Sequence, residues 1–512
     1  MNPPTQPNSA ARNILLIVSD QHNPHIAGYA GNPHVRTPNL DRLARTGTRF
    51  TNACCTCPVC KPSRMSYMTG KHVHQIENWW NRVPLDPEEM TWARKLDGHG
   101  IETTLLGKID AAGTYENPGF TRCKLSMRRR AFEPYPRQVP QPKMVAGATR
   151  EASRAYIDDA GAFDPESTQD TKQGYNPAHG LYFQDRQVLQ WTKEFLEEKG
   201  AADDAAPWVA HIGFEYPHWP YVCPRKYFDM YYPDNIELPF DAAFPRNETL
   251  HPALQEWQRW NDLGDVSEDR LRRVLAAYYG MVTCMDDMIG EILHALAAQG
   301  LSENTLVIYT SDHGESLGEH GLFFKHSPAA ASVGVPLIMG GPGVPEGRTL
   351  HVPVSLVDLY PTILDCCGLA TEDDRPGDSL FDIISGRVTR GDRPEEGVFA
   401  EWHGPGFEGA WYMLLNSTWK YVWYESHPPA LYNIRQDPRE QRDLAPNPQY
   451  AELLNLFERE LRTRVDPETV SRKAKKDLGV ITADGHDLSR KHGPCGEAQT
   501  GGEAALERLR PA

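Results

Sequence analysis

The fold class is first indicated by Asn13-Ile14-Leu15-Leu16-Ile17-Val18-Ser19, an apolar run that is followed at once by Asp20. Such a run, with no polar residue at alternate positions, is typical of a strand buried on both faces of a parallel sheet. Further apolar runs lie at 103–106, 208–214 and 305–310, and segments with helical periodicity separate them. This alternation of strand and helix predicts a doubly wound, mostly parallel α/β domain.

Polar residues follow these predicted strands. Asp20, Lys108, His218 and the pair Asp312-His313 each come soon after the end of one strand. In doubly wound domains the carboxyl ends of the parallel strands meet at one edge of the sheet, and ligands bind beyond that edge. The sequence therefore predicts that these side chains converge on one site.

Helices and one long insertion are expected around these strands. The insertion covers about 116–179, a region that is polar and rich in proline and glycine. Such a region predicts a loop over the active face of the sheet. The helical periods, with their start and stop residues, predict helices over 38–47, 91–97, 183–199 and 268–299.

The pattern changes at about residue 387 to short β-rich segments separated by turns. These segments predict a small antiparallel sheet closed by a helix over 450–463. The polar tail from about residue 466 is expected to wrap or fray. We therefore expect a catalytic α/β domain over 12–386 and a smaller α+β subdomain over 387–512. The predicted strands of the subdomain lie at 397–402, 411–415, 420–424 and 431–434.

Composition narrows the class of function. The 512 residues carry a formal net charge of −16, which argues against nucleic-acid binding, because neutralising phosphates needs a basic surface. The run Arg128-Arg129-Arg130 is expected on a solvated face, with the rim of an anionic pocket as the alternative. Residues 1–12 lack the apolar segment of a signal peptide, and ten cysteines in so long a chain suit a reducing compartment. We expect a cytoplasmic protein without a membrane partner, and the sequence leaves a homo-oligomer open.

The motif C-x-P-S-R at residues 60–64 carries the most chemical information. Pro62 suits the first turn of a helix, so Cys60 is expected at a helix start, where the positive end of the helix favours developing negative charge. Cys54, Cys57 and Cys60 also have the C-x2-C-x2-C spacing with which iron–sulfur clusters begin. A cluster and a buried structural thiol are therefore the alternatives to a reactive cysteine.

The same motif resembles that of the type I sulfatases of the alkaline phosphatase superfamily. In that family it is the sequence at which a formylglycine-generating system oxidises the cysteine to formylglycine. The resemblance implies that one hydroxyl of the hydrated aldehyde at position 60 attacks the sulfur of a sulfate ester, after which the other expels sulfate. The partners that it implies are a small-molecule or saccharide sulfate ester and the modifying system.

The resemblance also implies one divalent metal ion. Its ligands would be Asp20, Gln21, Asp312 and His313, completed by the converted Cys60. Carboxylate and amide oxygens favour calcium, whereas the imidazole makes manganese a competitor, with magnesium as a further alternative. Gln21 stands where many sulfatases have another aspartate, which lowers the charge of the ligand set.

Catalytic roles are implied for four further residues. Arg64 matches the arginine that holds the formylglycine hydroxyl and the metal-ligand carboxylates. Lys108 and Lys325 match lysines that bind sulfate oxygens and spread the charge of the transition state. His218 matches the imidazole beside the bridging oxygen and is expected to be the general acid for the leaving alcohol, with Lys325 as its rival.

Substrate contacts are implied for two more positions. Asn81 matches an asparagine that contacts substrate in choline-sulfatase-like and phosphonate-hydrolase-like relatives, and nearby Asn78 is the alternative. Asp110 replaces a histidine that most sulfatases have near the sulfate, so it is expected to accept a hydrogen bond or to orient Lys108. With Glu401-Trp402-His403-Gly404, this aspartate makes the chain similar to the glucuronate-2-sulfatases of the family. The likeness extends from residue 13 to about residue 463.

Three functions are compatible with these residues. The first is hydrolysis of a sulfate monoester, such as a uronate 2-sulfate or another sugar or aryl sulfate. The second keeps the scaffold and nucleophile but acts on phosphonate monoesters or phosphodiesters. Lys108 favours the first, because the phosphonate hydrolases lack a lysine of this kind. The third is a non-catalytic binding protein in which Cys60 stays unmodified.

Overall fold

The computed structural model describes most of the chain. The described residues are 13–81, 83–110, 117–125, 157–165, 177–202, 206–234, 236–238, 250–261 and 266–479. Most of the expected insertion, the three arginines at 128–130 and the tail after residue 479 lie outside these ranges. None of the described helices is long and apolar enough to cross a membrane.

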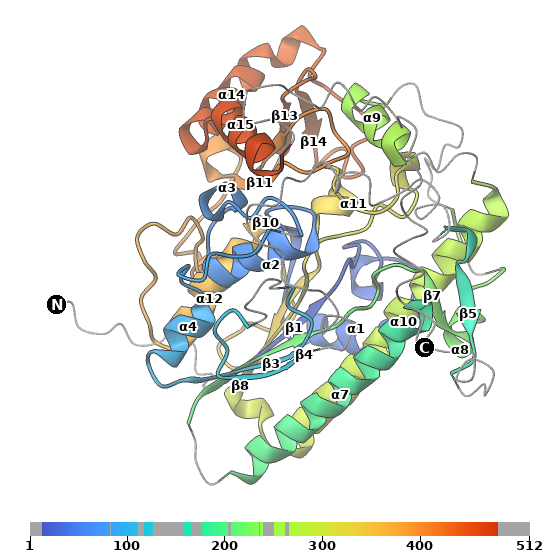
Figure 1. The fold of residues 1–512 in the computed structure, drawn as a ribbon, viewed down its shortest axis with the longest axis vertical. Coiled ribbons are helices and arrows are strands. Elements are labelled where there is room, and N and C mark those ends of the chain that lie inside the picture. Colours follow the sequence, from blue (N-terminus) through green and yellow to red (C-terminus); the bar gives the residue numbers. More distant parts are fainter. Residues whose placement is uncertain are drawn as a thin grey trace.

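An eight-stranded sheet forms the centre of the molecule (Figure 1). Its strand order is β10-β2-β9-β8-β1-β6-β3-β4, and every neighbouring pair is parallel except the two that involve β9. This arrangement confirms the predicted doubly wound, mostly parallel α/β fold. In the same order, the strands span Arg348–Ser355, Thr48–Cys54, Leu337–Gly340, Thr305–Ser311, Asn13–Ser19, Trp208–Gly213, Glu102–Gly107 and Arg122–Leu125.

The central strand β1 shows why its sequence is apolar throughout. Leu16 and Val18 belong to the hydrophobic cluster on one face of the sheet, whereas Leu15 and Ile17 belong to the cluster on the other face. Every residue of β1 is buried. Because helices cover both faces, neither set of alternating side chains meets solvent, and the strand links two hydrophobic cores.

Two helical layers cover the sheet. The long helices α7 and α10 run side by side across one face (Figure 1). That face carries α1 (Pro38–Arg45), α7 (Pro177–Ala201), α8 (Arg225–Phe228) and α10 (Glu268–Ala298). The other face carries α2 (Cys60–Thr69), α4 (Trp92–Asp97), α12 (Leu359–Cys366) and α13 (Leu380–Ser385). The smaller elements are α3 (Val73–Ile76), α9 (Pro252–Asn261), α11 (Ala330–Val333), β5 (Gly161–Phe163) and β7 (Val222–Pro224).

The C-terminal part contains the predicted antiparallel sheet, in the order β11-β12-β13-β14. On β12, Trp411 and Met413 pack into the cluster of the α2 layer, whereas Tyr412 and Leu414 pack into a separate cluster with Phe457 of α14. One face of this sheet therefore shares a core with the α/β part. Its elements are β11 (Val398–Trp402), β12 (Trp411–Leu415), β13 (Trp419–Tyr424), β14 (Ala430–Asn433), α14 (Ala451–Arg464) and α15 (Pro467–Asp477).

Two expectations about local structure are wrong. Residues 122–125, expected in a loop, form the edge strand β4, whose charged and exposed side chains lack the apolar pattern of a buried strand. Residues 467–477, expected in a polar tail that wraps or frays, instead form a regular helix, α15. Its start is capped by Asp466, which accepts a hydrogen bond from the Thr469 N–H at 3.0 Å, and Pro467 occupies the first turn.

Candidate active site

The ends of four parallel strands bring the predicted residues to one edge of the sheet. Ser19 of β1 pairs with Ser311 of β8, so the two aspartates that follow lie side by side. Likewise Gly107 of β3 pairs with Gly213 of β6. A Cβ on Gly213 would lie 1.9 Å from the carbonyl oxygen of Lys108, so only glycine permits this close approach. The register of the sheet thus sets the geometry of the site.

Cys60 is the first residue of α2, which follows an extended Val59 and ends where Gly70 adopts a φ of 68°. All ten residues of α2 are buried. This burial fixes the helix start, and hence the thiol, against the edge of the sheet. The sulfur occupies the place that the oxygens of a hydrated formylglycine would take after modification.

Three side chains surround the Cys60 sulfur. It lies 3.2 Å from Lys325 Nζ, 3.4 Å from His313 Nε2 and 3.9 Å from Asp20 Oδ1. Burial and the charge of Asp20 raise the pKa of the thiol, against the opposing effect of Lys325. An unmodified Cys60 is therefore a protonated thiol and a poor nucleophile.

Asp20, Cys60, Asp312 and His313 form a buried group of potential metal ligands. One ligand atom from each lies within 4.8 Å of all the others. A divalent cation binds carboxylate oxygens at about 2.0–2.6 Å, so atoms with this mutual spacing can surround one ion. The donor set therefore fits the single divalent metal that the resemblance implied.

The protonation states in this group suit a cation. Burial lowers the pKa of His313 to about 4, so the ring is neutral near pH 7. Its Nδ1 faces the Gly314 carbonyl oxygen at 2.9 Å and must carry the hydrogen, which leaves a lone pair on Nε2 toward the cluster. Burial would raise the pKa of Asp20, but Lys108 and other nearby cations outweigh it and hold that pKa well below 3.8.

Arg64 ties the nucleophile helix to the strand ends. Its Nε donates to Asp312 Oδ2 at 2.9 Å, and Nη1 donates to the carbonyl oxygen of Lys108 at 3.1 Å. A further nitrogen lies 3.5 Å from Asp20 Oδ2. The guanidinium thus fixes the positions of both carboxylates and is itself held by the carbonyl oxygen that follows β3. A planar group with several donors can make these contacts together.

Lys108 is buried among carboxylates. Its Nζ makes an ion pair with Asp20 and lies 3.0 Å from Glu215 and 3.5 Å from Asp110. Asp110 is therefore placed to orient Lys108, and its backbone adopts a φ of 63°, which few residues other than glycine tolerate. Sequence reasoning missed Glu215, although it lies two residues after the end of β6 and obeys the same strand-end rule.

Gln21 and Lys325 meet beside the cluster. Lys325 Nζ donates to Gln21 Oε1 at 2.8 Å as well as toward Cys60 Sγ. The Gln21 amide nitrogen donates to Glu315, another buried carboxylate that sequence reasoning gave no role. Gln21 has a φ of 70°, held by a hydrogen bond from its N–H to Asp312 Oδ1 at 3.1 Å. In this arrangement Gln21 positions Lys325, and its place among the metal ligands stays a prediction.

His218 lies in the loop after β6, buried and close enough to Asp20 to lower the pKa of that carboxyl. The ring atom Nδ1 is 2.5 Å from the Trp219 carbonyl oxygen, and the backbone N–H of His218 donates to the Glu215 carbonyl oxygen at 2.9 Å. A carbonyl oxygen only accepts, so Nδ1 carries a hydrogen and Nε2 is the atom that can take up or release a proton.

Asn81 and Asn78 have different surroundings. The Asn81 carboxamide oxygen accepts a hydrogen bond from the Lys61 N–H at 3.0 Å, next to Cys60. Asn78 is buried, and its amide donates to the Val83 carbonyl oxygen at 2.7 Å. Asn81 is thus the asparagine beside the nucleophile helix, whereas Asn78 stabilises the loop that contains Asn81.

The alternative of an iron–sulfur cluster finds no support. The described residues group Cys60 with two aspartates and a histidine, rather than with Cys54 or Cys57. Burial raises the pKa of the Cys57 thiol, as does the neighbouring Glu401. Within the described part of the chain the cysteines are free thiols.

The fold and this strand-end constellation define an α/β enzyme of the alkaline-phosphatase-like class. A model of the Sulfatase family matches residues 12–369, and a second, described as N-sulphoglucosamine sulphohydrolase, C-terminal, matches residues 318–466. The chain therefore belongs to the sulfatase family, whose members are sulfuric ester hydrolases.

Curated relatives agree with this assignment. The chain is 30% identical to arylsulfatase K of Canis lupus familiaris over 483 residues, which cover 90% of the chain and 84% of the relative. It is 30% identical to human (Homo sapiens) arylsulfatase K over 455 residues, covering 85% and 79%. Choline-sulfatase of Rhizobium meliloti (strain 1021) is 28% identical over 446 residues, covering 85% and 83%.

Solved structures share the fold. A phosphonate monoester hydrolase of Agrobacterium radiobacter has a TM-score of 0.69 and 25% identity, covering 93% of this chain and 99% of that one. A 2-O GAG sulfatase has a TM-score of 0.71 and 21% identity, covering 96% and 99%. Both likenesses extend over nearly the full length of the chain.

Proposed function

We propose that this sulfatase hydrolyses a sulfate monoester of a sugar, using a formylglycine made from Cys60 and one divalent ion, with calcium as the first expectation. The observation that carries the proposal is the position of Cys60. It begins a buried helix with the motif C-x-P-S-R, and Lys325, His313 and Asp20 lie within 3.9 Å of its sulfur. Its host must supply a formylglycine-generating system.

The side chains around Cys60 suit the charges of this reaction. Lys325 and Lys108 are cations on two sides of the site and would hold the sulfate oxygens as negative charge develops on them. Arg64 keeps the two aspartates in place. His218 would pass a proton from Nε2 to the leaving oxygen. A hydrated formylglycine supplies a nucleophile that no encoded side chain offers, and the metal would favour its ionised form.

The proposed substrate class is a sugar sulfate, with a uronate 2-sulfate first. Asp110 and the segment 401–404 give the chain its likeness to glucuronate-2-sulfatases, and arylsulfatase K relatives match over most of its length. A 2-O GAG sulfatase shares the fold. Asp110 lies beside Lys108, where a carboxylate can accept a hydrogen bond from a hydroxyl group of the sugar.

A second candidate is hydrolysis of phosphonate monoesters or phosphodiesters. It is favoured by the structural likeness to a phosphonate monoester hydrolase at 25% identity. The charged groups around Cys60 suit a tetrahedral anionic group. Such a group can be a phosphorus ester or a sulfate ester, because the two have similar shapes. Lys108, buried beside the site, favours sulfate.

The test is a panel of substrates given to the formylglycine-bearing, metal-loaded protein. It contains uronate, hexosamine, choline and aryl sulfates beside a phosphonate monoester and a phosphodiester. We expect the highest kcat/KM for a uronate 2-sulfate. A higher value for the phosphonate would favour the second candidate. Absence of turnover on every ester, with Cys60 shown to be unconverted in a host that modifies other sulfatases, would favour a binding protein.

A further inference from the structure

A group of aromatic rings extends from the reactive cluster toward the C-terminal sheet. Neighbouring ring centroids in this group are 4.5–5.8 Å apart. We name it the aromatic platform. Its members are Trp80, Trp257, Trp260, His326, Trp402 and Phe407.

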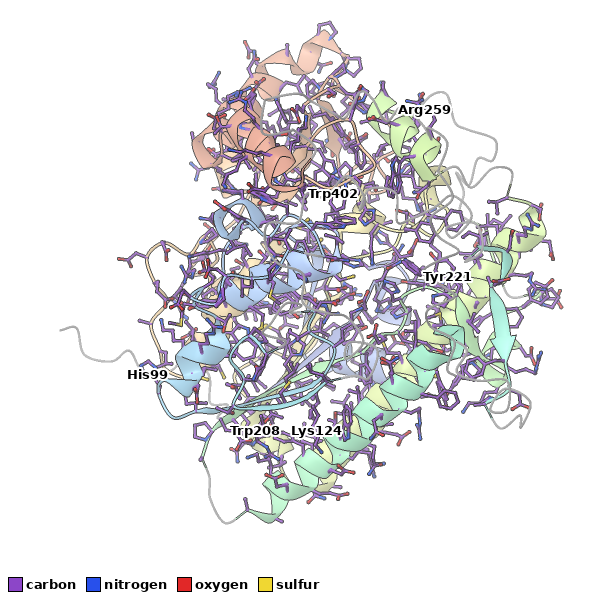
Figure 2. All side chains as sticks on the ribbon, in the orientation of Figure 1. His99, Lys124, Trp208, Tyr221, Arg259 and Trp402 are labelled. Carbon is purple, nitrogen blue, oxygen red and sulfur yellow. The ribbon has the colours of Figure 1, made fainter. Side chains whose placement is uncertain are left out.

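The platform begins one residue away from two groups that lie beside Cys60. Trp80 precedes Asn81, which binds the N–H of Lys61. His326 follows Lys325, whose Nζ is 3.2 Å from the Cys60 sulfur. Figure 2 shows Trp402 at the base of the C-terminal sheet, where that sheet meets the main body of the molecule. The rings therefore lead away from the place where the sulfate ester is expected to bind.

The platform has a buried floor and a partly open surface. Trp402 and Trp257 are fully buried. Trp80, Trp260 and Phe407 are only half-buried, and so is His326. Aromatic side chains that keep part of their ring area open to solvent at a functional site are typical of ligand contacts.

Two glycines and one hydrogen bond hold the platform in place. A Cβ on Gly404 would lie 2.7 Å from the Trp402 ring and 2.8 Å from the Trp80 ring. A Cβ on Gly406, whose φ is 103°, would lie 2.2 Å from the Trp257 ring. The indole N–H of Trp411 donates to the carbonyl oxygen of His326 at 3.0 Å. A surface fixed in this way loses little conformational entropy when a ligand binds.

Polar atoms without a partner lie among the rings. His326 Nδ1, Ser327 Oγ and Gln258 Oε1 are buried and have no hydrogen-bond partner among the described residues. Buried polar atoms are normally paired, so these atoms indicate a missing partner such as water or a ligand hydroxyl. Ring faces combined with such polar atoms match a sugar, which has apolar C–H faces and hydroxyl groups at its edge.

We propose that the aromatic platform binds the sugar unit next to the sulfated one, so that the substrate is an oligosaccharide sulfate. This inference rests on the proposed function and makes its substrate class narrower. The added contacts lie away from the sulfur atom, and binding energy from such remote contacts positions the ester for reaction. A lone sulfated monosaccharide would use only part of the site.

The test compares matched substrates that carry one uronate 2-sulfate: a monosaccharide, a disaccharide and a tetrasaccharide, beside 4-nitrophenyl sulfate. We expect kcat/KM to rise at least tenfold from the monosaccharide to the disaccharide. Trp80→Ala should lower kcat/KM for the disaccharide by a factor at least about ten times larger than for 4-nitrophenyl sulfate, because the disaccharide loses a stacked ring. Trp80→Phe keeps a ring and should restore much of that loss. Trp260→Ala is a second variant, at the edge of the platform.

Trp191→Ala is the matched control, because Trp191 is half-buried on α7, on the opposite face of the sheet. It should leave all four rates near those of the wild type. Equal kcat/KM for mono- and disaccharide, or equal losses on all substrates in Trp80→Ala, would overturn the inference while leaving the sulfatase proposal intact. A changed oligomeric state in Trp80→Ala, with unchanged substrate preference, would assign the platform to a second copy of the chain. Failure of every sulfate ester would instead overturn the proposed function itself.

Discussion

His218 illustrates how a single neighbour fixes the chemistry of a side chain. Its Nδ1 is bound to the Trp219 carbonyl oxygen, so the proton that can move is on Nε2. Lys325 is held differently, because its Nζ donates to Gln21 and points at Cys60 Sγ. From these surroundings we expect His218 to be the better proton donor and Lys325 the better sulfate ligand.

Substitution of His218 tests this division of roles. An alkyl or sugar alcohol leaves poorly unless it is protonated, whereas a nitrophenolate leaves readily without help. His218→Ala should therefore lower hydrolysis of a sugar sulfate by about 10²–10⁴-fold and of 4-nitrophenyl sulfate much less. Lys325→Ala should damage both substrates similarly. If the leaving-group preference appears in Lys325→Ala instead, the lysine is the acid.

Asp312 is predicted to affect metal content and turnover together. Asp312 belongs to the potential metal site, and its Oδ2 accepts a hydrogen bond from Arg64 Nε. Asp312→Asn removes the negative charge, so elemental analysis should show less bound metal per chain, and kcat should fall with it. The control is Glu458→Gln, an exposed carboxylate paired with Arg462 on α14, which should leave metal content and turnover unchanged. Full metal content with normal turnover in Asp312→Asn would remove this residue from the site.

At the scale of elements, strand β11 joins the C-terminal sheet to the nucleophile segment. Glu401 of β11 is fully buried and accepts hydrogen bonds from the N–H and the ring of His74, both at 2.9 Å, and from His403 at 2.8 Å. Its own N–H donates to the Thr56 carbonyl oxygen at 2.8 Å. Through its carboxylate and its backbone, Glu401 therefore connects segments around residues 56, 74 and 401–403, which meet only in the folded chain.

This carboxylate gives a pH-dependent contribution to stability. Burial would raise the pKa of Glu401, but His74 and His403 outweigh it and hold the pKa far below 4.5. Its stabilisation is thus present above pH 4.5 and is lost as the pH falls toward the depressed value. Burial would lower the pKa of His74, but Glu401 raises it above 6.5, so that stabilisation is complete below pH 6.5 and lost at higher pH. The two contributions overlap between pH 4.5 and 6.5.

Glu401→Gln should lower the free energy of unfolding by about 1–3 kcal/mol in that window, because the histidines lose a charged acceptor. Denaturant unfolding at several pH values measures the difference, which should shrink below pH 4.5. The control is Glu458→Gln, which removes an exposed ion pair with Arg462 on α14 and should cost little. A difference that stays constant from pH 3 to 8 would contradict the assigned ionisation.

At the scale of the whole molecule, the sequence predicted the positions of those site residues that follow from a rule of sheet geometry. Apolar strands that end in polar residues predicted Asp20, Lys108 and Asp312 at one edge, because parallel strands align their ends. Glu215 obeys the same rule and could have been predicted in the same way. Contacts between residues that only the folded chain brings together could not be predicted from the sequence. The rings of Trp80 and His326 lie 5.3 Å apart, tilted by 51°, although the two residues are 246 positions apart in the sequence, and no local pattern marks that pairing.

The central claim is that formylglycine at position 60 is the nucleophile. The most direct measurement compares kcat on a sulfate ester with the fraction of Cys60 converted, determined by peptide mass spectrometry in preparations made with and without a formylglycine-generating enzyme. We predict turnover proportional to conversion, no turnover for Cys60→Ala, and most of it retained in Cys57→Ala. Equal turnover in converted and unconverted preparations, or comparable losses from both substitutions, would contradict the account.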